Sequence, residues 1–322
     1  MNIAVVIPAY NEALTIAATI EDFASAIPEC TIVVVDNNSK DETYALAKKA
    51  LEKLGPRGRV ISEPRQGKSN AVRRAFSEVE ADVYVMVDAD CTYAASDLAT
   101  LVAPVLAGEA DMTVGDRHSS GDYARENQRA FHTAGNDGVR KLINVLFNTD
   151  LKDILSGYRC FSAQFVKNFP ILSAGFELET ELTLHALEMR FRIREVPISY
   201  KDRPAGSFSK LNTYRDGLRV INTVFAILRY SRPFRFFAAI GALLFLLGVG
   251  AGAAPVVEFY RTGRILHIPS AILATGLMVC SLINVAIAVI LDMVARESRI
   301  AYELRLMSWR PAPRPGANPG GR

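Results

Sequence analysis

The sequence is poor in the residues that build zinc sites and disulfide frameworks. Its 322 residues include only four cysteines, which lie far apart, and no two of them form a C-x-x-C pair. Basic residues are also spread out, with no run of five or six in a row and a net charge of only +3. The pattern therefore indicates neither a metal or disulfide scaffold nor a nucleic-acid-binding protein.

Two further signals are missing. The chain starts directly with the apolar stretch 2–7, without the basic start and cleavage site of a secretory signal, and we interpret this stretch as a first strand. Gly67-Lys68-Ser69 matches the end of a phosphate-binding P-loop, but Ser62 stands where the first glycine is required. That substitution excludes a P-loop ATPase.

Apolar residues, in contrast, make up 50% of the chain, and they follow two patterns. In the N-terminal part, three runs rich in Val and Ile alternate with helix-like stretches: Ile3–Ile7, Thr31–Val35 and Val83–Val87. This pattern is typical of βαβ units around a mainly parallel sheet. Each run ends in polar residues, and ligands of open α/β sheets bind beyond the carboxyl ends of the strands. The sequence therefore predicts an α/β fold with its site at that edge.

Local signals predict further elements. Ser39, with Glu42 three residues later, forms a capping box that predicts a helix start and gives Ser39 and Asp41 structural roles. The less regular stretch 111–210 is expected to hold polar loops, a helix from Glu177 to Met189 and a strand near 193–200.

The second apolar pattern consists of two long uncharged runs. Phe236–Val257 has about 22 residues and Ile268–Leu291 about 24, whereas roughly 20 residues cross a hydrocarbon core. The alternative is a buried helical hairpin, although such long uncharged runs are rare in soluble cores. Arginines flank the pair on its outer sides: Arg229, Arg232, Arg235, Arg296, Arg299, Arg305 and Arg310. Since only Arg261 and Arg264 lie between the runs, the positive-inside rule predicts that both termini are cytoplasmic in a bacterial cell.

Residues 213–230 precede these runs and carry apolar side chains at helical spacing beside Arg215, Arg219 and Arg229. They predict an amphipathic helix on a membrane surface, or one that covers the soluble domain, because an apolar helix face by itself fits both surroundings. The Pro- and Gly-rich tail 311–322 is expected to be disordered.

Asp88-Ala89-Asp90 follows the third strand and projects two carboxylates toward the predicted edge. Hard oxygen ligands at this spacing suit Mg²⁺ or Mn²⁺ that bridges phosphates. A D-x-D sequence is common in solvated loops, but its place at a strand end favours a metal site. Such an ion would neutralise charge on a leaving diphosphate.

Three motifs in order carry a family resemblance. Val6-Ile7-Pro8-Ala9-Tyr10-Asn11-Glu12, then residues 34–43, then Asp88-Ala89-Asp90 resemble the motifs of family 2 glycosyltransferases with the GT-A fold. The likeness continues through 153–159 and 195–198 to Arg203, Ser209 and Lys210. With its two apolar runs, the chain is similar to polyprenyl-phosphate glycosyltransferases and dolichol-phosphate mannose synthases over nearly its whole length.

The resemblance implies a nucleotide-sugar donor, and it assigns residues to it by position. A carboxylate at a strand end, such as Asp36, also suits hydrogen bonds from a ribose hydroxyl or a base N–H. For Tyr10, packing in the core is the alternative. The implied donor residues are Pro8, Tyr10, Glu12, Asp36, Asn38, Lys68, Asp88, Asp90 and Arg117. Asp88 and Asp90 would also hold the metal, Mg²⁺ or Mn²⁺.

The implied acceptor is a polyprenyl phosphate, whose phosphate is largely ionised near neutral pH because its second pKa is about 6. Positioning by basic groups then matters more than a strong base. The acceptor-phosphate candidates are Arg203, Ser207, Ser209 and Lys210. An extra residue relative to the family spacing leaves Ser207 and Ser209 as alternatives.

Acidic residues near 177–181 are further catalytic candidates. Glu177 and Glu181 would share a helix face, with Glu179 turned away, and one of them would orient the acceptor. A solvated acidic face is the alternative. Arg159 is a catalytic candidate or a structural salt-bridge partner. The four histidines show no ligand spacing and are expected in loops or on the surface: His118, His132, His185 and His267.

The resulting prediction is a GT-A catalytic domain at 1–210, an amphipathic surface helix at 211–234, a transmembrane hairpin at 235–295 and a basic tail at 296–322. The enzyme would move one hexose-type sugar, from a UDP-sugar rather than GDP-mannose, to a polyprenyl phosphate such as undecaprenyl phosphate. The family implies inversion at the anomeric carbon. The reaction would take place at the cytoplasmic face of the plasma membrane and serve cell-envelope glycan synthesis.

Two alternatives stay open. A processive polysaccharide synthase shares the fold, but the chain lacks a Gln-x-x-Arg-Trp motif and has only two predicted spans. A non-catalytic membrane adaptor is disfavoured by the retention of both aspartates. The oligomeric state is open, and the small residues Gly241, Gly248 and Gly252 would permit close packing between subunits.

Overall fold

The computed structural model describes residues 1–119, 130–171, 178–201, 225, 227–229, 232–264 and 266–310, and of residues 130–136 the backbone alone. The chain divides into two compact units. One comprises residues 1–216 with 308–322, and the other comprises residues 217–307. Each unit is described by itself.

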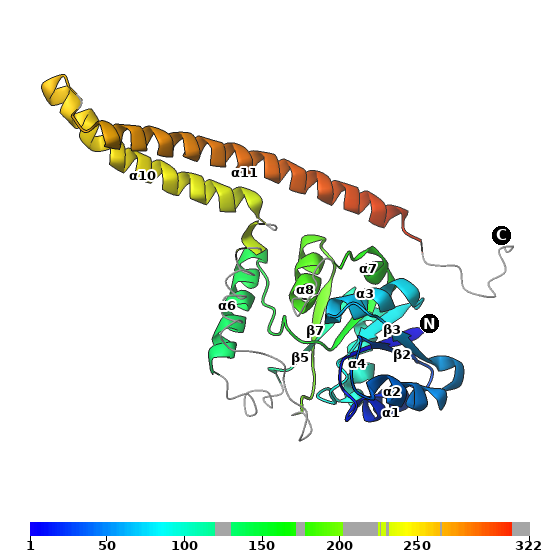
Figure 1. Cartoon of the computed structure of the whole chain (residues 1–322). Coiled ribbons are helices and arrows are strands. Elements are labelled where there is room, and N and C mark those ends of the chain that lie inside the picture. Colours follow the sequence, from blue (N-terminus) through cyan, green and yellow to red (C-terminus); the bar gives the residue numbers. More distant parts are fainter. Residues whose placement is uncertain are drawn as a thin grey trace, which may run out of the picture. The chain divides into compact units, whose positions relative to one another are not determined.

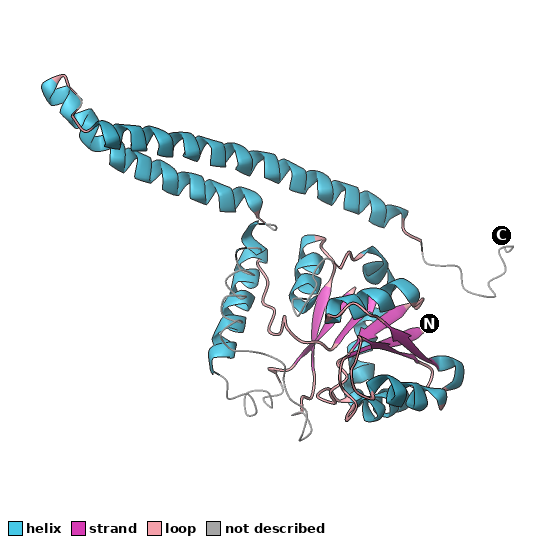
Figure 2. Ribbon diagram, in the orientation of Figure 1, coloured by secondary structure: helices cyan, strands magenta, loops and turns pink. Residues whose placement is uncertain are grey.

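The first unit is built on a mostly parallel sheet with the strand order β3-β2-β1-β4-β6-β5-β7 (Figures 1 and 2). The strands are β1 (Ile3–Ala9), β2 (Thr31–Asp36), β3 (Gly58–Ser62), β4 (Val83–Met86), β5 (Met112–Asp116), β6 (Arg159–Ser162) and β7 (Ile193–Pro197). β6 runs antiparallel to both of its neighbours, β4 and β5, and the other pairs are parallel. The sheet thus has a parallel half, β3-β2-β1-β4, and a mixed half, β6-β5-β7.

Helices cover both faces of the sheet, which explains the Val- and Ile-rich strands. In β1, Val5 and Ile7 belong to the core on one face, while Ala4 and Val6 belong to the core on the other. The first face packs against α1 (Ile16–Ala26), α2 (Thr43–Glu52) and α4 (Leu98–Leu106). The second packs against α3 (Lys68–Glu78), α7 (Ala163–Asn168) and α8 (Leu178–Glu188). The unit also contains α6 (Ala130–Phe147) and the short 3₁₀ helices η1 (Gly55–Arg57) and η2 (Ala95–Asp97).

The α/β prediction is confirmed. Its three strands, its helix near 177–189 and its strand near 193–200 correspond to β1, β2, β4, α8 and β7, whereas β3, β5 and β6 were not predicted.

The predicted capping box does not form. Helix α2 begins at Thr43, and Glu42 occupies the N-cap position without a side-chain cap bond. Ser39 lies outside the helix, where its Oγ accepts a hydrogen bond from Asn11 N at 3.0 Å. Asp41 Oδ1 accepts one from Thr43 N at 3.0 Å. Both side chains are structural, but they connect loops rather than close a capping box.

The expectation that all histidines lie in loops or on the surface is wrong for His185. It lies on α8, and its ring packs against Phe165, Phe169 and Phe191 at centroid distances of 5.8, 4.9 and 6.2 Å. Its burial lowers the pKa of His185 to about 4.

The second unit contains two long apolar helices, α10 (Pro233–Thr262) and α11 (Ile268–Ser308), each long and apolar enough to cross a membrane. They pack through small residues. Ser281 Oγ donates a hydrogen bond to Gly241 O at 2.8 Å, and a Cβ on Gly248 would lie 3.3 Å from Leu277 Cβ. A Cβ on Gly252 would lie 3.3 Å from Ala274 Cβ. These glycines permit close packing of α10 and α11 within one chain, and the oligomeric state stays open.

Most of the predicted amphipathic helix 213–230 lies outside the described residues, as does the tail 311–322. The predicted domain boundaries stay a prediction.

Candidate active site

The carboxyl ends of β1, β2 and β4 meet at one edge of the sheet, because β1 pairs in parallel with both other strands. Ala9 lies beside Asp36 in this register, and Asp88 follows β4 by two residues. The topology therefore brings three motifs that are far apart in the sequence to one edge.

Lys68, the first residue of α3, joins two carboxylates at this edge. Its Nζ donates a hydrogen bond to Glu179 Oε1 at 2.6 Å and forms an ion pair with Asp88 Oδ1. The three side chains are 16%, 10% and 29% exposed, in the order Lys68, Glu179 and Asp88, so water screens them only in part. Burial alone would lower the pKa of Lys68, but the two carboxylates raise it above its ordinary value. The ammonium group therefore stays charged beside Asp88.

This arrangement corrects one prediction. Glu179, expected to turn away, faces the site through Lys68, while Glu181 is partly exposed. Glu177 lies outside the described residues. Sequence spacing shows which residues share a helix face, but it does not show which of these faces packs toward the sheet.

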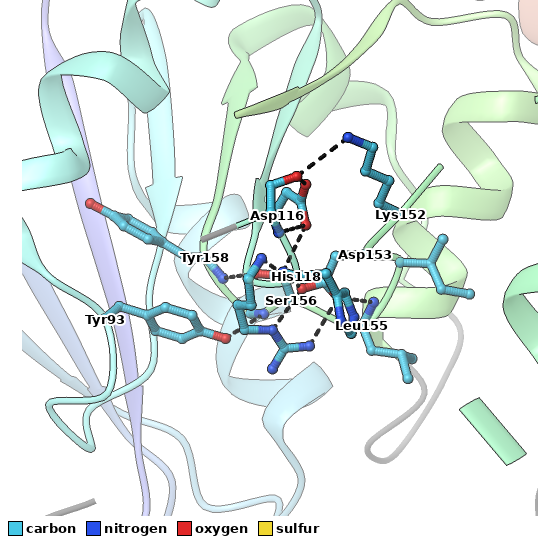
Figure 3. A network of polar contacts seen from close by, with 12 residues as sticks. Tyr93, Asp116, His118, Lys152, Asp153, Leu155, Ser156 and Tyr158 are labelled. Carbon is cyan, nitrogen blue, oxygen red and sulfur yellow. Dashed lines mark hydrogen bonds and ion pairs between the residues drawn. The ribbon is translucent and has the colours of Figure 1, made fainter. Parts of the chain in front are cut away.

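The backbone of Gly157 lies directly against the Asp88 carboxylate. A Cβ at this position would collide with Asp88 Oδ2 and lie 3.1 Å from Lys68 Nζ. Its backbone N–H donates to the hydroxyl oxygen of buried Tyr93 at 2.9 Å (Figure 3). Only glycine allows the backbone to come this close to the carboxylate.

Asp90 is buried, and its Oδ1 accepts hydrogen bonds from Thr92 N at 3.2 Å and Thr92 Oγ1 at 2.6 Å. Among the described residues, no group of three or more His, Cys, Asp or Glu side chains could hold a metal by itself. A divalent ion at Asp88 and Asp90 would complete its ligands from substrate phosphates and water, as Mg²⁺ commonly does. Carboxylate oxygens are the type of ligand that such an ion prefers.

Asp36 offers an unused acceptor at the same edge. The residue is 5% exposed, and its buried Oδ1 has no hydrogen-bond partner among the described residues. Its other oxygen accepts a weak bond from Ser39 N at 3.4 Å. Because an unsatisfied buried acceptor is costly, this oxygen fits a ligand donor such as a ribose hydroxyl or base N–H.

The loop that carries Tyr10 and Glu12 is fixed to the loop after β2 and to the start of α2. Glu12 N donates to Thr43 Oγ1 at 2.8 Å, and Lys40 N donates to Asn11 Oδ1 at 2.7 Å. Asn11 and Asn38 both have left-handed backbone conformations, with φ of 53° and 60°, which asparagine tolerates better than most residues. Pro8, Tyr10 and Glu12 are partly buried and Asn38 is exposed, at the same edge as Asp36.

A second loop, 63–67, positions Lys68. Buried Asn37 donates to the carbonyls of Glu63 and Arg65 at 3.2 and 2.6 Å, and its Oδ1 accepts from Gly67 N at 2.7 Å. Hydrogen bonds from Arg65 lower the pKa of Glu63 to about 2. Asn37 lies within the motif 34–43, but neither Asn37 nor Glu63 was predicted as a site residue from the sequence.

The mixed half of the sheet holds Arg117 in place. Its Nε and Nη2 donate to Asp153 at 2.7 and 2.9 Å, and Glu195 accepts from Asp153 N at 2.7 Å. Burial alone would raise the pKa of Asp153, but the hydrogen bonds from Arg117 lower it. Asp116 accepts from His118 N at 2.8 Å in the same network (Figure 3). Arg117 is therefore oriented rigidly after β5.

Arg159 does not reach the site surface. It is fully buried on β6 and donates to Ser156 O at 2.8 Å, Ile154 O at 2.6 Å and Thr183 Oγ1 at 2.9 Å. Burial lowers its pKa to about 10. These bonds give it a structural role, in place of the predicted catalytic one, since they fix the loop that leads to Gly157. The acceptor candidates Arg203, Ser207, Ser209 and Lys210 lie outside the described residues.

Comparison with known proteins gives consistent matches. Residues 4–169 match a family model described as Glycosyl transferase family 2. The chain is 29% identical to glycosyltransferase AglJ of Haloferax volcanii over 77% of this chain and 79% of that protein. It is 28% identical to an undecaprenyl-phosphate mannosyltransferase of Micrococcus luteus over 69% and 92%. A solved structure of glucosyl-3-phosphoglycerate synthase from Mycobacterium tuberculosis with Mn²⁺, UDP and glucosyl-3-phosphoglycerate has the same fold, with a TM-score of 0.53, 22% identity and coverage of 71% and 78%.

Proposed function

The chain belongs to glycosyl transferase family 2, and from that membership we propose that it transfers one hexose-type sugar from a nucleotide-sugar to a polyprenyl phosphate. The observation that carries the proposal is the shared edge of β1, β2 and β4. There, Asp36 offers an unused buried acceptor within the same site as Asp88, Asp90 and the Lys68 ammonium group. A nucleoside diphosphate needs both kinds of group, acceptors for its nucleoside and positive charge for its phosphates.

In this proposal, Asp36 accepts hydrogen bonds from the nucleoside, and the loop 10–13 packs along it. Lys68 lies beside Asp88 and moves its charge toward the diphosphate as the donor enters. Asp88 and Asp90 would hold a Mg²⁺ or Mn²⁺ ion, which would supply further positive charge to the leaving diphosphate. The solved relative from Mycobacterium tuberculosis contains Mn²⁺ and UDP, which supports this choice of ion and favours a UDP-sugar.

The acceptor side needs little base catalysis. A lipid phosphate oxygen is already largely ionised at neutral pH, so it attacks the anomeric carbon once it is positioned, with inversion. We infer that Arg203, Lys210 and one of Ser207 and Ser209 hold this phosphate. The polyprenyl-phosphate acceptor is supported by the name of the Micrococcus luteus relative.

The place of reaction follows from the same proposal. The helices α10 and α11 are apolar enough to span a bilayer, and a polyprenyl phosphate is itself confined to the membrane. We propose that the catalytic domain and both termini face the cytoplasm, where nucleotide-sugars are made.

A donor screen tests the proposal. Purified full-length protein in detergent is mixed with undecaprenyl phosphate, Mg²⁺ or Mn²⁺, and UDP-glucose, UDP-galactose, UDP-N-acetylglucosamine or GDP-mannose. We expect nucleoside diphosphate release with one donor, dependent on the lipid and abolished by EDTA. The lipid product should carry one sugar, whereas a series of growing products would indicate a processive synthase. No release with any donor would overturn the proposal.

A further inference from the structure

A basic hollow lies at one end of the pair α10 and α11. It has a volume of about 340 Å³ and is lined by Arg232, Phe234 and Arg235 from the start of α10 and by Asp292 and Arg299 from α11. All five residues belong to the second unit, and none of them is a candidate residue of the site at the sheet edge.

The packing of α10 against α11 shows where along the helix axes the hollow lies. Gly241 lies opposite Ser281, and a Cβ on Gly248 would lie 3.4 Å from Ala274 O, so the two helices run antiparallel (Figure 1). The apolar run of α10 starts at 236 and that of α11 ends at 291, directly beside the residues that line the hollow. Both runs therefore stop at this level, which is where lipid headgroups lie if the pair spans a bilayer.

The charge of the hollow is unbalanced. Three guanidinium groups and one carboxylate from the described residues line it, so it carries net positive charge. Guanidinium groups match phosphate oxygens with paired N–H donors, and arginine recognises phosphate better than lysine for this reason. Phe234, 46% exposed, adds an apolar wall next to the charged groups. A lipid offers a partner for both, because its phosphate can bind the guanidinium groups and its apolar chain can pack against Phe234.

We propose that this hollow binds the phosphate group of a membrane lipid at the surface of the bilayer. The inference rests on the proposed membrane insertion of α10 and α11 but not on sugar transfer. Arg235 and Arg299 contact the phosphate, Phe234 packs on the adjoining apolar part, and Asp292 limits the affinity. Such a site would fix the depth and rotation of the helical pair relative to the membrane.

Two lipids could supply this phosphate, a bulk anionic phospholipid and the polyprenyl phosphate itself. Full-length protein in a neutral detergent is titrated with phosphatidylglycerol, phosphatidylcholine or undecaprenyl phosphate, without nucleotide-sugar, and bound lipid is counted by native mass spectrometry. We expect saturable binding of phosphatidylglycerol well above that of phosphatidylcholine. Displacement of phosphatidylglycerol by undecaprenyl phosphate at equal or lower concentration would identify the polyprenyl phosphate as the preferred source, and no displacement would identify the phospholipid.

Matched double variants locate the binding. R235Q/R299Q removes two arginines from the hollow, and R261Q/R264Q removes two from the opposite end of the pair. We expect the first to weaken anionic lipid binding about 30-fold, because each arginine that is removed takes away a charge-assisted contact with the bound phosphate. The second changes no residue of the hollow and should leave the binding unchanged. Equal losses in both variants, or none in R235Q/R299Q, would overturn the proposal.

Asp292→Asn provides a test that does not depend on removing arginines. Loss of this carboxylate from the lining of the hollow should strengthen phosphatidylglycerol binding several-fold without changing phosphatidylcholine binding. Weaker binding in this variant would contradict the proposed site. Because no sugar donor is present, these results do not depend on whether the transfer reaction takes place.

Discussion

The two halves of the sheet differ in how the charged side chains at their ends are hydrogen-bonded. In the parallel half, Asp36 keeps an oxygen without a partner among the described residues, and Asp88 shares Lys68 with Glu179 at the edge. In the mixed half, the Asp153 carboxylate accepts two hydrogen bonds from Arg117, and the Asp153 backbone N–H donates one to Glu195. This difference agrees with the proposal that the parallel half binds the donor, whereas Arg117 and Asp153 of the mixed half are bonded to each other.

The strongest test of this division is Asp90→Asn. The variant keeps the shape of the side chain and its bond with Thr92 but removes a charge that the proposed metal and diphosphate need. We expect kcat/KM for nucleoside diphosphate release to fall by about 10²–10³-fold, the loss typical of one preorganised electrostatic group. The circular dichroism spectrum should not change. Exposed Asp150→Asn is the control, and full activity in Asp90→Asn would refute the metal role.

In the mixed half, the corresponding change is Arg159→Met. It leaves the carbonyls of Ile154 and Ser156 buried without their donor, so we expect the free energy of unfolding to fall by about 2–5 kcal/mol. The measurement is thermal unfolding, followed by the reactivity of the buried Cys160 thiol. Arg194→Met on β7, whose side chain is exposed, serves as the control. A stability equal to that of the control would contradict the structural role of Arg159.

A double-mutant cycle tests the link between Lys68 and Glu179. Glu179 orients Lys68, so Glu179→Gln should lower kcat about 10-fold and Lys68→Met about 10²-fold. Because both act through the same ammonium group, the double variant should be no worse than Lys68→Met alone. Activity assays at saturating donor measure all three. Fully additive losses would show that Glu179 acts independently of Lys68.

Three strands of the parallel half, β1, β2 and β4, were predictable because they are buried on both faces and read as unbroken Val and Ile runs, as in 31–35. The edge strand β3 is only partly buried and was not predicted. In the mixed half, β7 was predicted, but β5 and β6 were not. β6 is only four residues long and begins with Arg159, whose charge is satisfied by loop carbonyls that no sequence pattern reveals. Glu179 was misplaced for a related reason. Helical spacing groups residues into faces, but tertiary packing decides which face meets Lys68.

A smaller effect is expected from Asp36→Ala. If its unpartnered oxygen accepts a bond from the nucleoside, removal of the side chain should raise the KM for the donor about 10-fold with little change in kcat. Initial rates over a donor concentration series separate the two constants. Ser39→Ala, which loses a loop contact but no proposed donor contact, is the control. A fall in kcat alone would place Asp36 in the chemistry rather than in donor binding.

The smallest effect concerns a partly buried titratable group, His185, whose ring packs among Phe165, Phe169 and Phe191. Burial lowers its pKa to about 4, below the roughly 6.5 of an unfolded histidine. The unfolded state therefore binds the proton first, and the stability that neutral His185 provides above pH 6.5 is lost as the pH falls toward 4. His185→Phe should reduce this loss, by at most about 1.4 kcal/mol per pH unit for one proton, as measured by unfolding at pH 7, 5.5 and 4.5. The control is His118→Gln at an exposed position, which should behave like the wild type. If the stability curves of His185→Phe and the wild type run parallel, the aromatic cluster tolerates the charged ring and the prediction is wrong.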